Sequence, residues 1–365
     1  MDLTIALPET PARLSVVRIG EGMIERVLED IERDGSGLSS TYWIWDERVW
    51  EIWGGKLCER FGWPGPGDGR VILFAASEPN KRLAAVEELA RALVQRGADR
   101  QCALVAVGGG VTGDVVGVVA SLYMRGIPFY QMPTTLLAQV DSSVGGKTGV
   151  DLPEGKNLVG AFHQPRIVWI DSCFLGSLPD LEFRQGMAEV IKTAMLGDES
   201  LWRFLGEQGD ALRRREGAAL TRMIEASCRV KASVVEEDEK EAGRRRVLNL
   251  GHTVGHALEK LSGYALRHGD AVAMGMMVAA TLSVRLGELP EAELRQLESL
   301  CRFWDLPVSV PGEYASDAIL EAMMSDKKKM RDKLYFILPV RPGEVKDLVN
   351  PDPRLLGDAI SALRL

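Results

Sequence analysis

Short apolar runs alternate with helical patterns from about residue 41 to residue 131. After the run at residues 71–74, apolar positions recur at helical spacing from Leu83 to Val94, which predicts a helix with one buried face. Strands that alternate with helices favour a mostly parallel sheet covered on both faces. The runs predicted to be strands are residues 42–45, 71–74, 103–107 and 127–132.

Beyond about residue 175 the pattern changes, because long helical stretches dominate and β-branched runs nearly vanish. We therefore expect an α/β domain over residues 1–175 and an all-α domain over residues 176–365. No internal repeat is visible. The predicted helices of the second domain are residues 181–196, 218–236, 253–261, 271–286 and 291–304.

The composition excludes several classes of partner. The chain has 365 residues, 46% of them hydrophobic, and a net charge of -8, which argues against nucleic acid or an anionic membrane as its partner. An anionic substrate must therefore be attracted by locally placed lysines and arginines. Five scattered cysteines without a CxxC pair, and a start without a signal-peptide pattern, predict reduced thiols in a cytoplasmic protein. The longest apolar stretch, residues 271–282, is too short to span a bilayer.

A glycine loop follows the third predicted strand. Residues 108–113 (GGGVTG) satisfy G-x-G-x-x-G between a strand and a helix, where helix amides can hold a pyrophosphate; the alternative is an ordinary tight turn. The loop does not follow the first strand, and no acidic residue stands at the usual distance after it. Asp46, or Glu78 with Lys81 beside it, could instead contact the adenosine ribose. A carboxylate there would repel a 2′-phosphate, so a Rossmann-like domain that binds NAD is favoured over one that binds NADP.

Three of the four histidines lie within seventeen residues, at His252, His256 and His268. His252 and His256 would share a helix face, so they could bind one metal ion as an HxxxH pair, with His268 as a third candidate. Catalytic zinc sites usually take three protein ligands, often including a carboxylate. Glu189 is attractive because it lies in an apolar helix, where an unpaired charge is costly. The alternative is that these histidines are helix caps or buried hydrogen-bonding groups. His163 stands apart and is expected to be structural.

Polar and basic residues recur between these two regions. Each alone would be a solvated surface charge, although Lys192 lies three residues after Glu189 and hence on the same helix face. The loop around Gly146-Lys147 does not satisfy GxxxxGK[ST], so a kinase or NTPase is a poor interpretation. The constellation comprises Asp141, Lys147, Lys156, Asn157, Lys192, Lys231, Arg245 and Asn249.

Several long strings, in order, resemble the 3-dehydroquinate synthases, a branch of the sugar-phosphate cyclase family. They include residues 123–126 (YMRG), 133–141 (PTTLLAQVD) and 157–160 (NLVG), and the resemblance runs from about residue 46 to residue 339. It implies an NAD-binding α/β domain, a helical metal-binding domain and usually a homodimer. It also implies that 3-deoxy-arabino-heptulosonate 7-phosphate loses phosphate and closes to a carbocycle, with NAD regenerated in each turnover.

By position, the resemblance implies that the ligands of zinc or cobalt are Glu189, His252 and His268. His256 becomes an acid/base group near the site, which corrects the HxxxH pair. Arg125, reaching from a second subunit, and Asn157 match phosphate contacts. One lysine of residues 327–329, by preference Lys327, would reach the substrate, although the run lacks a glycine often found before the next strand. The other implied substrate contacts are Asp141, Lys147, Lys192, Lys231, Arg245 and Asn249.

The resemblance also implies the contacts with NAD. Ser177 stands where the family usually has threonine, and the serine keeps the hydroxyl group. The sequence around Glu78 and Lys81 departs from the one usual in the family. The matched positions are Asp46, Glu78, Lys81, Gly109, Gly110, Asp114, Thr134, Thr135, Lys156 and Ser177.

The implied chemistry needs cations. Because the substrate's phosphate can itself act as the base, the protein needs mainly cations to hold it. Lysines crowded near a metal ion and one another should have lowered pKa values. The alternatives are another cyclase of the family, acting on sedoheptulose 7-phosphate or glucose 6-phosphate, a metal-dependent polyol dehydrogenase that releases NADH, and a catalytically silent NAD- or metal-binding module. Arg245 and Asn249 beside His252 favour the dehydroquinate-forming subtype.

Overall fold

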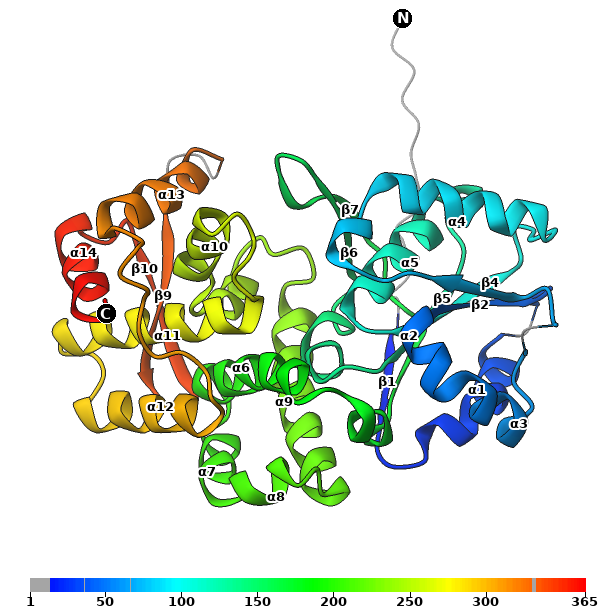
Figure 1. Ribbon diagram of the computed structural model, residues 1–365, viewed down its shortest axis with the longest axis horizontal. Helices are drawn as coiled ribbons and strands as arrows, with labels where there is room; N and C mark the ends of the chain where they lie inside the picture. Colours follow the sequence, from blue (N-terminus) through cyan, green and yellow to red (C-terminus); the bar gives the residue numbers. More distant parts are fainter. Residues whose placement is uncertain (1–13, 36, 66, 330–332) are drawn as a thin grey trace, which may run out of the picture.

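The computed structural model describes residues 14–35, 37–65, 67–329 and 333–365, without the side chains of residues 325–329. Two lobes lie side by side, with the helices α6 (Asp180–Gly197) and α9 (Gly217–Glu237) between them (Figure 1). Within the described ranges, no helix combines the length and apolar character needed to cross a membrane.

The N-terminal lobe is built on six parallel strands in the order β1-β8-β5-β4-β2-β3. The four predicted strands are confirmed, whereas β1 and β8 at one edge were not predicted. The order reverses between β2 and β4, and ligands of such sheets bind at this switch point, beyond the carboxyl ends of the strands. The bounds are β1 (Val16–Ile19), β2 (Thr41–Asp46), β3 (Val71–Phe74), β4 (Ala103–Gly108), β5 (Phe129–Pro133) and β8 (Ile167–Ile170).

Helices cover both faces of this sheet, as alternating side chains require. Along β2, Tyr42 and Ile44 join the core under α4 (Leu83–Gln95) and α5 (Gly110–Leu122). Trp43 and Trp45 point the other way, into a core with Trp63 and residues of α1 (Val27–Asp34) and α3 (Gly55–Phe61). Burying both faces explains why these strands are almost continuously apolar.

An antiparallel hairpin of β6 (Lys147–Leu152) and β7 (Gly155–Phe162) stands outside the sheet. It carries Lys147, Lys156 and Asn157. Its tip extends toward the C-terminal lobe (Figure 1). Residues from this hairpin can therefore contact groups of the other lobe.

The second lobe is mainly helical, as predicted. The five expected helices are confirmed; the largest error at a helix end is at α11, which begins at His268 instead of Ala271. A two-stranded ribbon of β9 (Tyr335–Arg341) and β10 (Glu344–Val349) was not predicted. The helices other than α6 and α9 are α7 (Glu199–Glu207), α8 (Gly209–Arg213), α10 (His252–Leu261), α11 (His268–Arg285), α12 (Glu291–Phe303), α13 (Ser316–Lys329) and α14 (Pro353–Ala362).

Glycines allow α6, α10 and α11 to approach one another closely. A Cβ atom on Gly275 of α11 would lie 1.8 Å from the carbonyl oxygen of Gly251, which precedes α10 with a left-handed φ of 79°. A Cβ atom on Gly269 would lie 2.6 Å from the carbonyl oxygen of Gln185 in α6. The first contact brings the start of α10 against the middle of α11, and the second brings the start of α11 against the first half of α6.

We predict that Gly275→Ala destabilises the protein by about 1–3 kcal/mol or more, because the added methyl group meets backbone that cannot rotate away. Gly206→Ala in α7 is the matched control. Its Cβ atom has open space, so the alanine should be neutral or stabilise by up to about 1 kcal/mol. Urea unfolding of the three proteins measures both effects, and equal stability of Gly275→Ala and wild type would contradict the close approach.

Candidate active site

The glycine loop lies at the switch point of the sheet. Gly109 is the N-cap of α5, and a Cβ atom on Gly108 would lie 3.0 Å from Cβ of Asp46 at the end of β2. A Cβ atom on Gly113 would lie 3.0 Å from Oε1 of Gln131, so α5 packs directly on β5. The loop therefore has the close helix–strand packing and exposed helix amides of a dinucleotide site.

The charged side chain of Lys81 lies beside the glycine loop. The Lys81 ammonium is 2.6 Å from Oδ2 of Asp114 and donates a hydrogen bond of 2.6 Å to Oδ1 of Asn157. Burial disfavours the charged form of Lys81, but Asp114 outweighs it and raises the lysine pKa. Asn157, expected among the phosphate contacts, thus lies with residues expected to contact NAD, on backbone with a φ of 54°.

The other residues predicted to contact NAD differ in whether their polar groups already have hydrogen-bond partners. The hydroxyl of Thr134 is buried without a hydrogen-bond partner among the described residues, and that of Thr135 accepts from the Ala138 amide. Ser177 accepts a 2.8 Å hydrogen bond from the Trp53 indole and donates to the Phe174 carbonyl oxygen. Glu78 opens a short 3₁₀ turn, η3 (Glu78–Asn80), at the end of β3. Thr134 therefore offers a free polar group, whereas the Ser177 hydroxyl already has two partners.

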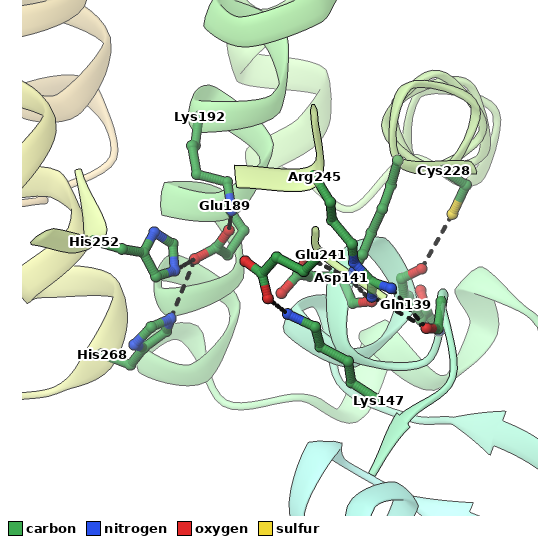
Figure 2. A network of polar contacts seen from close by, with 12 residues as sticks. Gln139, Asp141, Lys147, Glu189, Lys192, Cys228, Glu241, Arg245, His252 and His268 are labelled. Atoms are coloured by element: carbon green, nitrogen blue, oxygen red, sulfur yellow. Dashed lines mark hydrogen bonds and ion pairs between the residues drawn. The ribbon is translucent and has the colours of Figure 1, made fainter. Parts of the chain in front are cut away.

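In the C-terminal lobe, Glu189, His252 and His268 converge, with ligand atoms that all lie within 4.8 Å of one another (Figure 2). Oε1 of Glu189 lies 3.2 Å from Nε2 of His268 and 3.6 Å from Nε2 of His252. Its other oxygen contacts the Lys192 ammonium one turn along α6. A fully buried carboxylate with two imidazoles is the donor set of a divalent transition metal site.

The surroundings of the two imidazoles fit a cation. His252 Nδ1 lies 3.2 Å from the Leu250 carbonyl oxygen, so a hydrogen on Nδ1 leaves Nε2 toward Glu189 as a ligand atom. Burial and the neighbouring Lys192 lower the pKa of His252 to about 3, which keeps the ring neutral. Burial opposes protonation of His268, but Glu189 and Glu259 raise its pKa to about 10. The space between these carboxylates therefore favours a positive charge, as a metal ion or as a proton.

His256 does not complete this set. Its ring centroid is 5.2 Å from that of His252, but its ligand atoms group with those of Glu259 and His268. The HxxxH spacing alone favoured a pair that neither group of ligand atoms contains, whereas the set that the resemblance implied is one of the two groups that lie together. Its role as the metal site stays a prediction.

Cations and a carboxylate from both lobes meet next to Glu189. Lys231 of α9 donates a 2.6 Å hydrogen bond to Asp141 in η5 (Ala138–Ser142). Burial opposes ionisation of Asp141, but Lys231 and Lys192 outweigh it and lower its pKa. Arg245, in η7 (Arg244–Asn249), donates two 3.1 Å hydrogen bonds to the carbonyl oxygen of Gly145. The expected basic residues Lys147, Lys192, Lys231 and Arg245, called the basic array below, are therefore assembled across the two lobes (Figure 2).

The pKa values of the two buried lysines nearest Glu189 shift in opposite directions. Burial, with Lys192 and Arg245 nearby, lowers the pKa of Lys231 despite Asp141. Burial also opposes the charge of Lys192, but Glu189 and Asp141 outweigh it and raise the pKa of Lys192. The expectation for Lys192 neglected these two carboxylates.

Two acidic residues of the site were not predicted. Glu241 contacts the Lys147 ammonium and accepts a 3.1 Å hydrogen bond from the Asn249 amide. Glu259 lies against His268 on the side away from Glu189. Glu259 stands seven residues after His252 on the same helix, a spacing that could have indicated it; nothing comparable marks Glu241.

Two predicted residues are not brought into this cluster. Arg125 is exposed in η4 (Tyr123–Arg125) on left-handed backbone, with no ion pair in the described part of the chain. The side chain of Lys327, in α13, lies outside the described residues. His163 fits its structural interpretation, since its ring stacks on Phe129 and lies 2.9 Å from the Ile127 carbonyl oxygen.

The fold and the site define a two-lobed enzyme class in which a dinucleotide-type domain faces a carboxylate–histidine centre and a basic array. The sequence family described as 3-dehydroquinate synthase N-terminal matches residues 71–185, and 3-dehydroquinate synthase C-terminal matches residues 186–329. The chain belongs to the 3-dehydroquinate synthase family.

Three known proteins are similar to this chain along most of its length. A 3-dehydroquinate synthase of Syntrophotalea carbinolica is 48% identical over 272 residues, which cover 74% of this chain and 75% of the relative. The structure of a 2-epi-5-epi-valiolone synthase from Streptomyces hygroscopicus subsp. jinggangensis, with NAD+ and Zn2+ bound, superposes with a TM-score of 0.87 at 27% identity, covering 99% of each chain. A 2-deoxy-scyllo-inosose synthase with carbaglucose-6-phosphate, NAD+ and Co2+ superposes with a TM-score of 0.81 at 30% identity, covering 95% of this chain and 96% of the other.

We predict that His252→Ala weakens binding of Zn2+ by more than about 100-fold, whereas His256→Ala weakens it by less than about tenfold, because the ligand atoms of His252 group with Glu189 and those of His256 do not. Competition with a chromogenic chelator measures both dissociation constants. An equal loss of Zn2+ affinity in the two variants would instead support the HxxxH pair as the metal site.

Proposed function

We propose that this protein is a 3-dehydroquinate synthase, which converts 3-deoxy-D-arabino-heptulosonate 7-phosphate to 3-dehydroquinate and phosphate in the shikimate pathway of aromatic amino-acid biosynthesis. The observation that carries the proposal is the continuity of the site. A Cβ atom on Gly110 would lie 3.0 Å from Oγ of Ser142, next to Asp141, which in turn bonds Lys231 beside the Glu189 centre. Dinucleotide loop, basic array and metal-type centre are thus contiguous.

The cofactors are NAD and a divalent metal ion, zinc or cobalt. Glu189, His252 and His268 would hold the metal. The residues at the switch point would hold NAD, where the glycine loop leaves room for a pyrophosphate and Thr134 offers its unpaired hydroxyl. The dinucleotide supplies reversible oxidation of a substrate alcohol, and the metal ion supplies Lewis-acid polarisation of that carbon–oxygen bond.

The residues of the chain bind and orient the anionic substrate. Lys231, Arg245 and Lys147 form a positive cluster between the lobes, which can hold a carboxylate and a phosphate. Their hydrogen bonds to Asp141, to the carbonyl oxygen of Gly145 and to Glu241 fix them before substrate arrives. Such preorganised charge stabilises the departing phosphate without reorganisation in the reaction. His256 is placed to exchange protons at the edge of the site.

The phosphate can remove the proton whose loss precedes its own departure. The chain then needs cations to orient the phosphate dianion, and it has them. This arrangement explains why lysines and arginines outnumber candidate general bases in the basic array.

A different sugar-phosphate cyclase is the second candidate, since two solved cyclases of other specificity superpose along nearly the whole chain. Arg245 and Asn249 next to His252 favour the dehydroquinate-forming reaction. A polyol dehydrogenase would not need this basic array, and a silent binding module would not need to retain it complete.

We also propose a homodimer in which Arg125 of one subunit reaches the phosphate in the other. Its exposure, and that of Leu122 and Met124 beside it, supports this role. The five free thiols support a cytoplasmic location. A division into residues 1–175 and 176–365 agrees with the change from sheet to helices.

We predict that the purified protein with Zn2+, NAD and the heptulosonate phosphate releases one phosphate per substrate consumed without accumulating NADH. Phosphate release is measured with a coupled dye and NADH by its absorbance. Sedoheptulose 7-phosphate and glucose 6-phosphate serve as comparison substrates. NADH produced in proportion to turnover would indicate a dehydrogenase, and preference for a comparison substrate would indicate another cyclase.

The dimer proposal predicts subunit complementation. Arg125→Ala and His268→Ala should each be inactive, but a heterodimer purified through two different tags contains one intact site and should recover about half of wild-type activity. The same purification of two Arg125→Ala subunits is the control. A heterodimer no more active than its parents would place Arg125 outside the partner's site.

A further inference from the structure

Glu259 lies behind the metal-type centre, buried to 2% exposure on α10. Its Oε2 is 3.6 Å from Nδ1 of His268, whose Nε2 faces Glu189 on the other side. Its Oε1 accepts a 3.3 Å hydrogen bond from the Lys156 ammonium of the β6–β7 hairpin. One carboxylate thus touches both a predicted metal ligand and a predicted NAD contact, from different lobes.

We propose that Glu259 is a positioning residue, which holds the His268 ring so that Nε2 points at the metal, while Lys156 holds Glu259 in place. An imidazole with a free Nδ1 can rotate about its side-chain bonds. A carboxylate on Nδ1 fixes both the ring and its tautomer and makes Nε2 a stronger ligand. The inference rests on the proposed function, because it assigns a role in the same site.

A second metal ion held by Glu259, His256 and His268 is the competing explanation, since their ligand atoms also lie within 4.8 Å of one another. The Lys156 ammonium argues against it. This cation already occupies one oxygen of Glu259, and it lies 5.3 Å from the centroid of the Tyr264 ring, an aromatic group that attracts cations. The carboxylate is therefore neutralised by the chain itself, which leaves its other oxygen to face Nδ1 of His268.

The contact also joins the lobes. Lys156 belongs to β7, and Glu259 to α10. A shift of the hairpin away from α10 would free Glu259 from its lysine and loosen the orientation of His268. The geometry of the metal centre thus depends on a residue of the NAD-binding lobe.

The test compares Zn2+ affinity of full-length wild type, Glu259→Gln and Asp30→Asn by chelator competition, without substrate. Glu259→Gln should raise the dissociation constant roughly 10- to 100-fold. Asp30→Asn is the matched control, because Asp30 is a carboxylate buried to 1% exposure that accepts from the Trp169 indole and pairs with Arg18, remote from the site. This variant should stay within about threefold of wild type.

Absorption of the Co2+-loaded proteins gives a second readout, because the visible bands report ligand geometry, which a merely structural role would not change. Glu259→Gln should alter these bands and Asp30→Asn should not. Glu259→Asp, with the carboxylate one methylene shorter, should bind Zn2+ with intermediate affinity, and it carries the test if the glutamine variant does not fold.

The outcomes separate the two proposals. A wild-type protein that binds no Zn2+ would overturn the proposed function together with this inference. Wild type that binds Zn2+, with both Glu259 variants equal to it in affinity and spectrum, would overturn the role of Glu259 alone. The same holds if Asp30→Asn loses as much affinity as Glu259→Gln.

Discussion

A negative charge buried in the middle of α6 governs the arrangement of the C-terminal lobe. Glu189 is fully buried, between Ala188 and Val190 in a helix whose residues from Gln185 to Leu196 are all buried. Such a charge is tolerated only with close partners, and removing one partner of a buried pair costs about 3–5 kcal/mol. The partners come from α6 itself, from the start of α10 and from the start of α11. The requirement to neutralise one carboxylate therefore fixes how three helices meet.

Between the lobes, buried polar groups of η5 are paired through hydrogen bonds to backbone carbonyl oxygens. Gln139 of η5 donates to the carbonyl oxygens of Pro133 and Asp171, and the Cys228 thiol of α9 donates to the carbonyl oxygen of Gln139. These bonds tie η5 to the ends of β5 and β8 and to a helix of the other lobe. Asp141, two residues further on, is thereby held where Lys231 reaches it. The position of Asp141 in the basic array is therefore fixed by hydrogen bonds that join η5 to both lobes.

Much of the fold could be predicted because burial leaves a periodic record in the sequence. The continuous runs of β2 and β4 and the long helices α6 and α11 have such a record. The run of β8 (IVWI) is as apolar as that of β3 and could have been predicted, whereas β1 (VVRI) contains an arginine and no fully buried residue. The site was harder to predict. Spacing alone favoured His252 with His256, left His268 as a third candidate and made Glu189 attractive through its apolar helix. The resemblance was needed to select Glu189, His252 and His268 as one set. Glu241 was not predicted because its partner Lys147 lies 94 residues away in the sequence, and such a pair leaves no local pattern.

Two lysines of the array illustrate why long-range contacts also decide the chemistry. Lys192 faces two carboxylates, Glu189 and Asp141, which more than offset its burial and raise its pKa. Lys231 shares Asp141 but also faces Lys192 and Arg245, so burial prevails and its pKa falls. Identical side chains thus differ in their hold on a proton because of their neighbours. An anion bound against Lys231 and Arg245 would supply the missing negative charge and raise the pKa of Lys231. The array is therefore electrostatically incomplete without a substrate anion, which is a physical reason for it to bind one.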